Sequence, residues 1–335
     1  MEIDIKLIFY FFLFNIILFQ FNSYIANNLK LFDKPDFKRK IHKHSVPITG
    51  GIFLFLNLIF LTILLNINYY EFLGLNFSYK REFFAIIFLV LLIFLIGLFD
   101  DRYDIKPFTK LFLLSSIILI AILIDENLIV KTLNFYNFQQ NINLSNLSVP
   151  LTILFILLFL NAINMFDGID LQVSIYFLVI VLFLSIKYNI YYLFYFSPVI
   201  ILNSYFNSKN KLFLGDSGTY IIGILISWTI IKNYNLKSTF YCEEIFLIMA
   251  VPGLDMFRLF CIRIMNGKNP FKADKKHLHH LLLKKYSYLK TFLSIQFIII
   301  IPLFFYYFFP DRLSIAILIT LMLYILVLML ARLKQ

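Results

Sequence analysis

Long apolar runs separated by short polar segments dominate this chain. The clearest run is 83–99, which is uncharged and ends in the sequence DDRYD. A helix rises 1.5 Å per residue, so this run reaches roughly 26 Å, about the hydrocarbon thickness of a bilayer. The repeated pattern predicts an all-α, polytopic membrane protein with about eleven spans, near 6–27, 48–68, 83–99, 108–124, 150–166, 171–187, 190–205, 218–231, 244–262, 292–309 and 313–330.

The composition agrees with this pattern. The chain is 61% hydrophobic and 15% charged, whereas soluble domains average about 25% charged residues. No polar stretch is long enough to bury a core of its own, so we expect a single membrane domain over residues 1–335.

The distribution of positive charge predicts the orientation. A net charge of +11 would suggest nucleic-acid binding in a soluble protein, but here the positive-inside rule is the better explanation. Of the 30 Lys and Arg residues, 22 fall in the loops after odd-numbered spans and in the C-terminal tail. We therefore expect the N-terminus outside, the C-terminus in the cytosol, membrane lipid as a partner and no nucleic acid.

Three carboxylates follow the run 83–99, namely Asp100, Asp101 and Asp104. They lie at the C-terminal end of a helix, where the helix dipole already places partial negative charge. Such a cluster needs a positive partner, and oxygen ligands suit Mg²⁺. The alternative is a solvated acidic loop neutralised by Arg102 and Lys106. Asp100 and Asp104 would share a face if the helix continued.

The loop after the first span, 33–51, is dense in cations and ends in Gly50 and Gly51. An ordinary positive-inside anchor would explain the cations. The double glycine favours close backbone approach, either to a partner helix or to a ligand phosphate. Lys40 is the candidate substrate-binding cation of this loop.

The end of span five reads NAINMFDGID. Asn161, Asn164, Asp167 and Asp170 recur every three residues, so a continuous helix would align them on one stripe. Such a stripe is costly against lipid and is expected to face a protein-lined cavity. Structural polar packing is the alternative.

The sequence FLGDSG precedes span eight. Asp216 or Ser217 would serve as an ordinary helix N-cap. In the functional interpretation Asp216 contributes a carboxylate to the cation, and Phe213 offers a flat face to a nucleotide base.

The longest inner loop, 258–290, contains His277, His279 and His280. Their spacing cannot converge on one zinc ion from a regular helix, and no Cys is near. We expect anion binding instead, since mixed Lys, Arg and His groups suit a diphosphate. The cations of this loop are Arg263, Lys268, Lys272, Lys275 and Lys276.

The order of these motifs, a Gly-Gly loop followed by DDxxD, NxxNxxDGxD, FxGDxG and HxHH, resembles the polyprenyl-phosphate N-acetylhexosamine-1-phosphate transferases of glycosyltransferase family 4. The resemblance runs from about Asp33 to His280. The HLHH form resembles the bacterial undecaprenyl-phosphate N-acetylglucosamine-1-phosphate transferase branch, which starts O-antigen, common-antigen and teichoic-acid glycans.

The resemblance implies transfer of a HexNAc-1-phosphate from a UDP-N-acetylhexosamine to polyprenyl (undecaprenyl) phosphate, with release of UMP. It implies Mg²⁺, with Mn²⁺ as the alternative ion, at an active site of cytosolic loops (28–51, 100–110, 161–172, 205–218 and 258–290) in the bacterial inner membrane. A homodimer is one option. By carry-over, the catalytic residues are Asp100, Asp101, Asp167 and Asp170; the metal ligands are Asp216 and Asp101; and the substrate-binding residues are Lys40, Asn161, Asn164, Phe213, Arg263, His277, His279 and His280.

The chain departs from the family pattern at Leu171. The family reads D-G-x-D-G-L, whereas this chain reads DGIDLQ from Asp167. A side chain at this position could crowd a backbone that must approach the nucleotide. A catalytically impaired homologue acting as a membrane scaffold is therefore one alternative, and a transporter or flippase is another.

Overall fold

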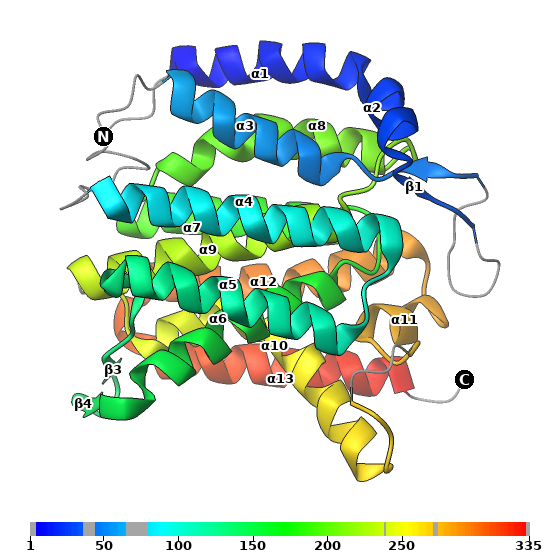
Figure 1. Ribbon diagram of the computed structural model, residues 1–335. Helices are drawn as coiled ribbons and strands as arrows, with labels where there is room; N and C mark the ends of the chain where they lie inside the picture. Colours follow the sequence, from blue (N-terminus) through cyan, green and yellow to red (C-terminus); the bar gives the residue numbers. More distant parts are fainter. Residues whose placement is uncertain (1–4, 36–43, 65–79, 238, 271–273, 333–335) are drawn as a thin grey trace. The chain divides into compact units, whose positions relative to one another are not determined.

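The computed structural model of the chain is mainly helical, and its described part also contains two short two-stranded ribbons (Figure 1). The structure describes residues 5–35, 44–64, 80–237, 239–270 and 274–332. The chain divides into two compact units: unit 1 is Met1–Leu128 with Ile180–Trp228, and unit 2 is Ile129–Val179 with Thr229–Gln335. Helices α7 (Gln172–Tyr188) and α9 (Gly215–Lys237) contribute residues to both.

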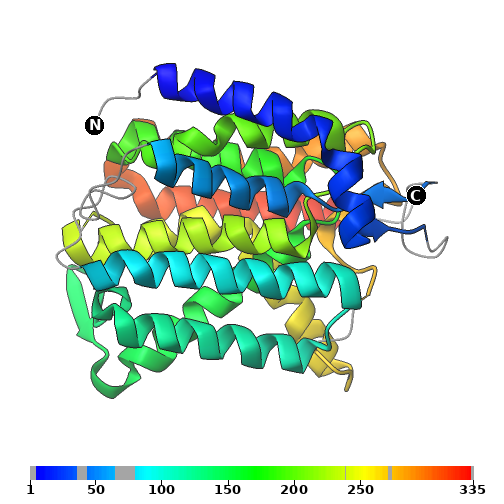
Figure 2. The ribbon, with the colours of Figure 1, turned by 45° about the horizontal axis from the view of Figure 1, so that its top comes forward.

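Unit 1 begins with a broken helix, because α1 and α2 meet at an angle of 54° (Figure 2). The side-chain amides of Asn15 and Asn57 exchange two hydrogen bonds of 2.8 Å, which join α1 to α3. Helix α4 packs along α5. The elements of the unit are α1 (Ile5–Gln20), α2 (Asn22–Leu29), β1 (Phe32–Asp33), β2 (Val46–Pro47), α3 (Gly50–Leu64), α4 (Lys80–Tyr103), α5 (Pro107–Ile124), η2 (Glu126–Leu128), η4 (Tyr192–Phe196) and α8 (Ser197–Asn207).

Unit 2 is organised around α10, which packs against α6, α12 and α13. An antiparallel ribbon of β3 and β4 pairs Thr132 with Asn143. The elements of the unit are β3 (Thr132–Phe135), β4 (Gln140–Asn143), η3 (Ser145–Leu147), α6 (Ser148–Phe166), α10 (Cys242–Met265), α11 (Leu278–Leu283), α12 (Tyr288–Phe308), η5 (Pro310–Arg312) and α13 (Leu313–Arg332).

A proline inside α10 leaves a backbone carbonyl that another helix satisfies. Pro252 has no N–H, so the carbonyl of Ile248, one turn earlier, loses its helical donor. The hydroxyl of Tyr176, from α7, donates a hydrogen bond of 3.0 Å to that oxygen. Tyr176 is fully buried, so this bond fixes α7 against α10 where lipid or core could not solvate the carbonyl.

Six helices in the described part are long and apolar enough to cross a membrane, or seven spans if α1 and α2 count as one broken span. The six are α4, α5, α6, α10, α12 and α13. The chain is therefore an integral membrane protein of mainly helical structure, as predicted. The expected number of eleven spans and their orientation stay predictions. Helices α3 and α7 are apolar but shorter than these six.

Candidate active site

Asp101 in unit 1 caps the N-terminus of α9. Its Oδ1 accepts a hydrogen bond of 2.6 Å from the backbone N–H of Asp216. Its Oδ2 accepts bonds from the backbone N–H (3.1 Å) and the Oγ (2.7 Å) of Ser217. The first N–H groups of a helix lack intrahelical partners and attract negative charge. The interpretation of Asp216 or Ser217 as the N-cap is therefore wrong, because the helix begins at Gly215 and α4 supplies the cap.

Glycines allow α3 and α4 to reach the start of α9. A Cβ at Gly51 or at Gly97 would lie 2.5 or 2.6 Å from a backbone nitrogen of α9. Gly215 has a φ of +74°, and a Cβ there would lie 2.7 Å from the Asp101 carboxylate. Of the two partners expected for the double glycine, a helix and a ligand phosphate, the structure places a helix there.

The backbone around Phe213 pairs with the segment before α3. The N–H of Phe213 donates to the carbonyl of Pro47 (2.8 Å), and the N–H of Gly50 donates to the carbonyl of Phe213 (3.1 Å). The N–H of Gly51 donates to the carbonyl of Leu214 (3.0 Å). These bonds bring two of the predicted site loops together and leave the Phe213 ring half-buried.

Lys110 links the two acidic motifs of unit 1. Its ammonium forms an ion pair with Asp100 and a second one, of 3.0 Å, with Oδ2 of Asp216. The side chains of Asp100 and Asp216 are 4% and 30% exposed, so only the second carboxylate reaches solvent appreciably. The positive partner of the acidic cluster is therefore Lys110 rather than Arg102 or Lys106.

Helix α4 ends immediately after the acidic pair. Asp104 has a φ of +51°, in the left-handed region, so α4 stops at Tyr103. The helix does not continue, so the condition under which Asp100 and Asp104 would share a helical face is not met. Oδ1 of Asp100 instead accepts a hydrogen bond of 2.8 Å from the N–H of Ile105, which closes the turn, and Asp104 is exposed.

The predicted polar stripe in unit 2 is interrupted. Helix α6 ends at Phe166, so Asn161 and Asn164 lie in its last turns while Asp167 caps it and Asp170 lies beyond it. The prediction that all four residues form a single helical stripe is therefore wrong. The side-chain amide of Asn161 donates a hydrogen bond of 2.7 Å to the carbonyl of Leu157 in its own helix. Asn164 and Asp170 are half-buried, and Asp167 is exposed.

Leu171 adopts the conformation for which glycine is suited. Its φ is +68°, in the left-handed region, which costs a residue with a side chain roughly 1–2 kcal/mol. The neighbouring turn is fixed, because the hydroxyl of Tyr288 donates to the carbonyl of Asp170 and the N–H of Gln172 donates 3.3 Å to the carbonyl of Ile169. The missing family glycine therefore coincides with a strained backbone position.

Three imidazoles cluster before and within α11. The rings of His277 and His279 stack with centroids 5.4 Å apart, and those of His279 and His280 lie 4.3 Å apart. His279 packs directly on Gly168, where a Cβ would overlap the ring. Burial, followed by the neighbouring His280 and His277, lowers the pKa of His279 to about 3. His279 is therefore neutral at physiological pH.

Arg263 holds the loop that leads to these histidines. Its Nε donates a hydrogen bond of 3.0 Å to the Asp274 carboxylate, and its Nη1 donates one of 2.7 Å to the carbonyl of Pro270. Its buried Nη2 has no hydrogen-bond partner among the residues that the structure describes. Burial opposes ionisation of Asp274, but the hydrogen bonds from Arg263 and from the N–H of Lys276 hold the pKa of Asp274 below its ordinary value.

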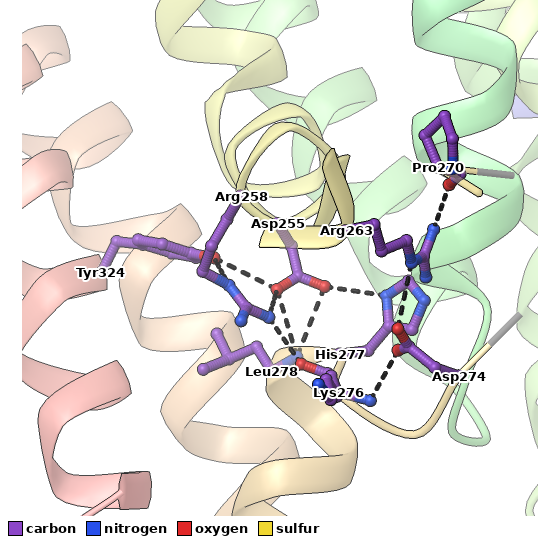
Figure 3. A network of polar contacts seen from close by, with 9 residues as sticks. All are labelled: Asp255, Arg258, Arg263, Pro270, Asp274, Lys276, His277, Leu278 and Tyr324. Atoms are coloured by element: carbon purple, nitrogen blue, oxygen red, sulfur yellow. Dashed lines mark hydrogen bonds and ion pairs between the residues drawn. The ribbon is translucent and has the colours of Figure 1, made fainter. Parts of the chain in front are cut away.

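Several residues of these networks had no role in the sequence interpretation. Asp255, Arg258 and Tyr324 form a buried polar network with His277 (Figure 3). A signal was present, because ionisable residues inside an apolar span are costly and usually functional. Lys110 gave a similar signal near the start of its span. Two predicted cations, Lys40 and Lys272, lie outside the described residues.

The donor set of unit 1 fits a hard cation in part. Asp101 already accepts three hydrogen bonds, out of about four that a carboxylate can take. Asp216 is partly exposed and accepts from an ammonium, so its oxygens suit Mg²⁺, which often takes one or two carboxylates plus substrate phosphates. Among the described residues, no group of three or more His, Cys, Asp or Glu side chains is placed to hold a metal.

Comparison with known proteins identifies the family. The family model for Glycosyl transferase family 4 matches residues 83–233. An undecaprenyl-phosphate alpha-N-acetylglucosaminyl 1-phosphate transferase of Pasteurella multocida (strain Pm70) is 32% identical over 275 residues, covering 78% of this chain and 73% of the relative. The chain belongs to glycosyl transferase family 4. This confirms the resemblance drawn from the motifs.

Other relatives of this family 4 protein carry the same description. The proteins from Salmonella typhi and Escherichia coli (strain K12) are 26% and 27% identical to it, each over 82% of this chain and 74% of the relative. The matched family segment contains the DDRYD, NAINMFDGID and FLGDSG motifs. The matched segment therefore includes three of the polar motifs as well as apolar spans.

Proposed function

We propose that the chain transfers a HexNAc-1-phosphate from a UDP-N-acetylhexosamine to polyprenyl phosphate, giving polyprenyl-diphosphate-HexNAc and UMP at the cytosolic face of a bacterial inner membrane. The observation that carries this proposal is the ion-paired group of Asp100, Lys110 and Asp216, which joins two motifs about one cationic centre. Relatives of the chain are described as undecaprenyl-phosphate alpha-N-acetylglucosaminyl 1-phosphate transferases.

The reaction needs two anions to meet. An oxygen of the lipid phosphate attacks the phosphorus that carries the sugar, and the bond from that phosphorus to the bridging oxygen of the diphosphate breaks. UMP leaves with the electron pair. The lipid phosphate is largely dianionic at pH 7, since the second pKa of a phosphate monoester is about 6. Catalysis is therefore mainly charge neutralisation and positioning.

Unit 1 supplies groups suited to the phosphates. Lys110 provides a fixed positive charge and, in this proposal, exchanges a carboxylate partner for a substrate phosphate oxygen. Asp216 would hold Mg²⁺, which supplies additional neutralisation of the diphosphate when bound. Asp100, held by Lys110 and by the N–H of Ile105, would position the lipid phosphate. Asp101 supports the site by fixing the start of α9.

Unit 2 supplies groups suited to the nucleotide sugar. The turn of Asp167 and Asp170 follows α6, and Asn161 and Asn164 precede it. Nη2 of Arg263, which has no hydrogen-bond partner among the described residues, offers a donor to a diphosphate or to sugar hydroxyls. The histidines at the start of α11 offer ring nitrogens that can bond to sugar hydroxyls. GlcNAc is the first candidate sugar, because the relatives are described as N-acetylglucosaminyl transferases.

The test uses the full chain purified in detergent with undecaprenyl phosphate, Mg²⁺ and a panel of UDP-HexNAcs, and it follows UMP release. We expect lipid- and metal-dependent UMP from the wild type and a loss of at least about 100-fold in Asp216→Asn. Asp104→Asn is the matched control, because Asp104 is exposed and Asn tolerates its left-handed backbone. If the wild type released UMP from none of the UDP-HexNAcs in the panel, the proposal would be contradicted.

A catalytically impaired homologue is the second candidate, and the left-handed Leu171 is the observation that favours it.

A mechanism through a covalent phospho-aspartate is the alternative to direct attack by the lipid phosphate. Incubation with labelled UDP-sugar in the absence of lipid separates the two routes, because only the covalent route leaves labelled sugar phosphate on the protein.

A further inference from the structure

A buried carboxylate in the apolar helix α10 is surrounded by donors. Asp255 is 5% exposed, and its Oδ1 accepts from Nη2 of Arg258 (2.7 Å), from the hydroxyl of Tyr324 (3.1 Å) and from the N–H of Leu278 (3.1 Å). Its Oδ2 lies 3.0 Å from Nδ1 of His277. Figure 3 shows these groups converging on the one carboxylate from α10, α13 and the start of α11.

Stability alone does not explain why Asp255 is buried as a carboxylate in this network. An ion removed from water loses several kcal/mol of solvation, and apolar residues of similar volume often replace buried ion pairs without loss of stability. The N–H of Leu278 and the ring of His277 belong to the HLHH motif. The carboxylate therefore contacts a proposed substrate-binding residue as well as the helices that support it.

The contact with His277 fixes which ring nitrogen carries the proton. An ionised carboxylate only accepts hydrogen bonds, so Nδ1 of His277 must be the donor. Nε2 is then the nitrogen that accepts a hydrogen bond when the ring is neutral. The ring plane is set as well, because the imidazole of His277 stacks on that of His279 with an angle of 10° between them.

We infer that Asp255 is a positioning residue of the transferase reaction, which acts through His277 by fixing its tautomer and its ring orientation at the start of α11. The inference rests on the proposed function for its catalytic consequence, but the tautomer is a property of the protein alone. Arg258 supports this contact, because its Nη2 donates hydrogen bonds of 2.7 Å both to the Asp255 carboxylate and to the carbonyl of Lys276.

The first measurement is the tautomer in the wild-type chain. Nitrogen-15 NMR of histidine-labelled protein in lipid bilayers, with His277→Gln to assign the signal, distinguishes a protonated Nδ1 from a protonated Nε2. We expect Nδ1–H in the wild type. In Asp255→Asn we expect a shift towards Nε2–H, because the side-chain amide can donate to Nδ1. A wild-type ring with its proton on Nε2 would overturn the inference, whether or not any variant folds.

The second measurement is a double-mutant cycle on kcat with UMP release as the readout. Asp255→Asn alone is expected to lower kcat by about 10–100-fold, the range for residues that orient a functional group. In the His277→Gln background the same change is expected to alter kcat less than threefold. Full additivity of the two changes would contradict an action through His277 and would indicate a general structural role.

Tyr324→Phe is the matched control. It removes one donor to Oδ1 of Asp255 while leaving Oδ2 and His277 in place. We expect a lower melting temperature, an unchanged tautomer and less than a threefold change in kcat. A loss equal to that of Asp255→Asn would overturn the inference. An inactive wild type with Nδ1–H would instead refute the proposed function while confirming the Asp255–His277 contact.

Discussion

Gly168 lies against the imidazole of His279 in unit 2, and a Cβ at residue 168 would overlap the ring. The glycine belongs to the turn after α6, and the histidine is in α11. Contact between these two residues joins two motifs that are more than a hundred positions apart in the chain. The glycine of the DGID sequence is therefore required for packing.

Gly168→Ala should displace either the ring or the turn. We expect a loss of about 1–3 kcal/mol in unfolding free energy from overpacking, together with a fall of at least about tenfold in UMP release, because a small misplacement of substrate-binding groups is costly. Gly253→Ala is the control, since among the described residues no atom other than those of its chain neighbours and its own helix backbone lies within 4 Å of its Cβ position in α10. That change should raise helix stability by roughly 0.5–1 kcal/mol; equal losses in both variants would contradict the packing argument.

Leu171→Gly should relieve backbone strain. Comparison with Leu171→Ala separates the backbone from the side chain, because Ala loses the same side-chain contacts but keeps the cost of the positive φ. We expect the Gly variant to be more stable than the Ala variant by about 1 kcal/mol, the reverse of the usual order. Chemical denaturation in mixed micelles measures it. A less stable Gly variant would show that the left-handed conformation is not populated.

His279 should make stability depend on pH. Its pKa is about 3 in the folded chain and about 6.5 when unfolded. Between these values the unfolded state binds more protons, so the free energy of unfolding falls as pH falls. The loss between pH 7 and pH 5 is on the order of 2 kcal/mol. His279→Gln should flatten this dependence, and an unchanged slope in that variant would assign the effect to another group.

Tyr176→Phe should leave the carbonyl of Ile248 without a donor. A buried unsatisfied polar group costs about 1–3 kcal/mol, so we expect a loss of stability in that range. Pro252→Ala restores the helical N–H for the same carbonyl. The effect of Tyr176→Phe should therefore be smaller in the Pro252→Ala background. Equal effects in both backgrounds would show that the hydroxyl of Tyr176 does not serve this carbonyl.

The sequence was sufficient to predict a helical membrane protein and its family, because apolar runs and ordered motifs are local features. It also indicated that Gly50 and Gly51 permit a close approach. It could not predict that Asp101 caps α9 or that Lys110 pairs with Asp216, because these residues are more than a hundred positions apart. Tertiary packing decides such pairs.

Helix ends were the other failure. The stripes expected from Asp100 to Asp104 and from Asn161 to Asp170 assumed that each helix continued. Asp104 takes a positive φ, and α6 gives way to a turn after Phe166. Asp and Asn tolerate such backbone conformations and can bond to local N–H groups. A spacing of three or four residues alone could therefore not distinguish a stripe from a helix followed by a loop.

The cap that Asp101 places on α9 would make folding of this site independent of the proposed Mg²⁺. A zinc finger, by contrast, is unfolded without its ion, because ion binding supplies the free energy of folding. Here hydrogen bonds from a backbone amide and from Ser217 already stabilise the Asp101 carboxylate, and Lys110 already neutralises Asp216. Chelation should consequently stop turnover while leaving the melting curve where it was, and re-addition of Mg²⁺ should restore activity without a refolding lag.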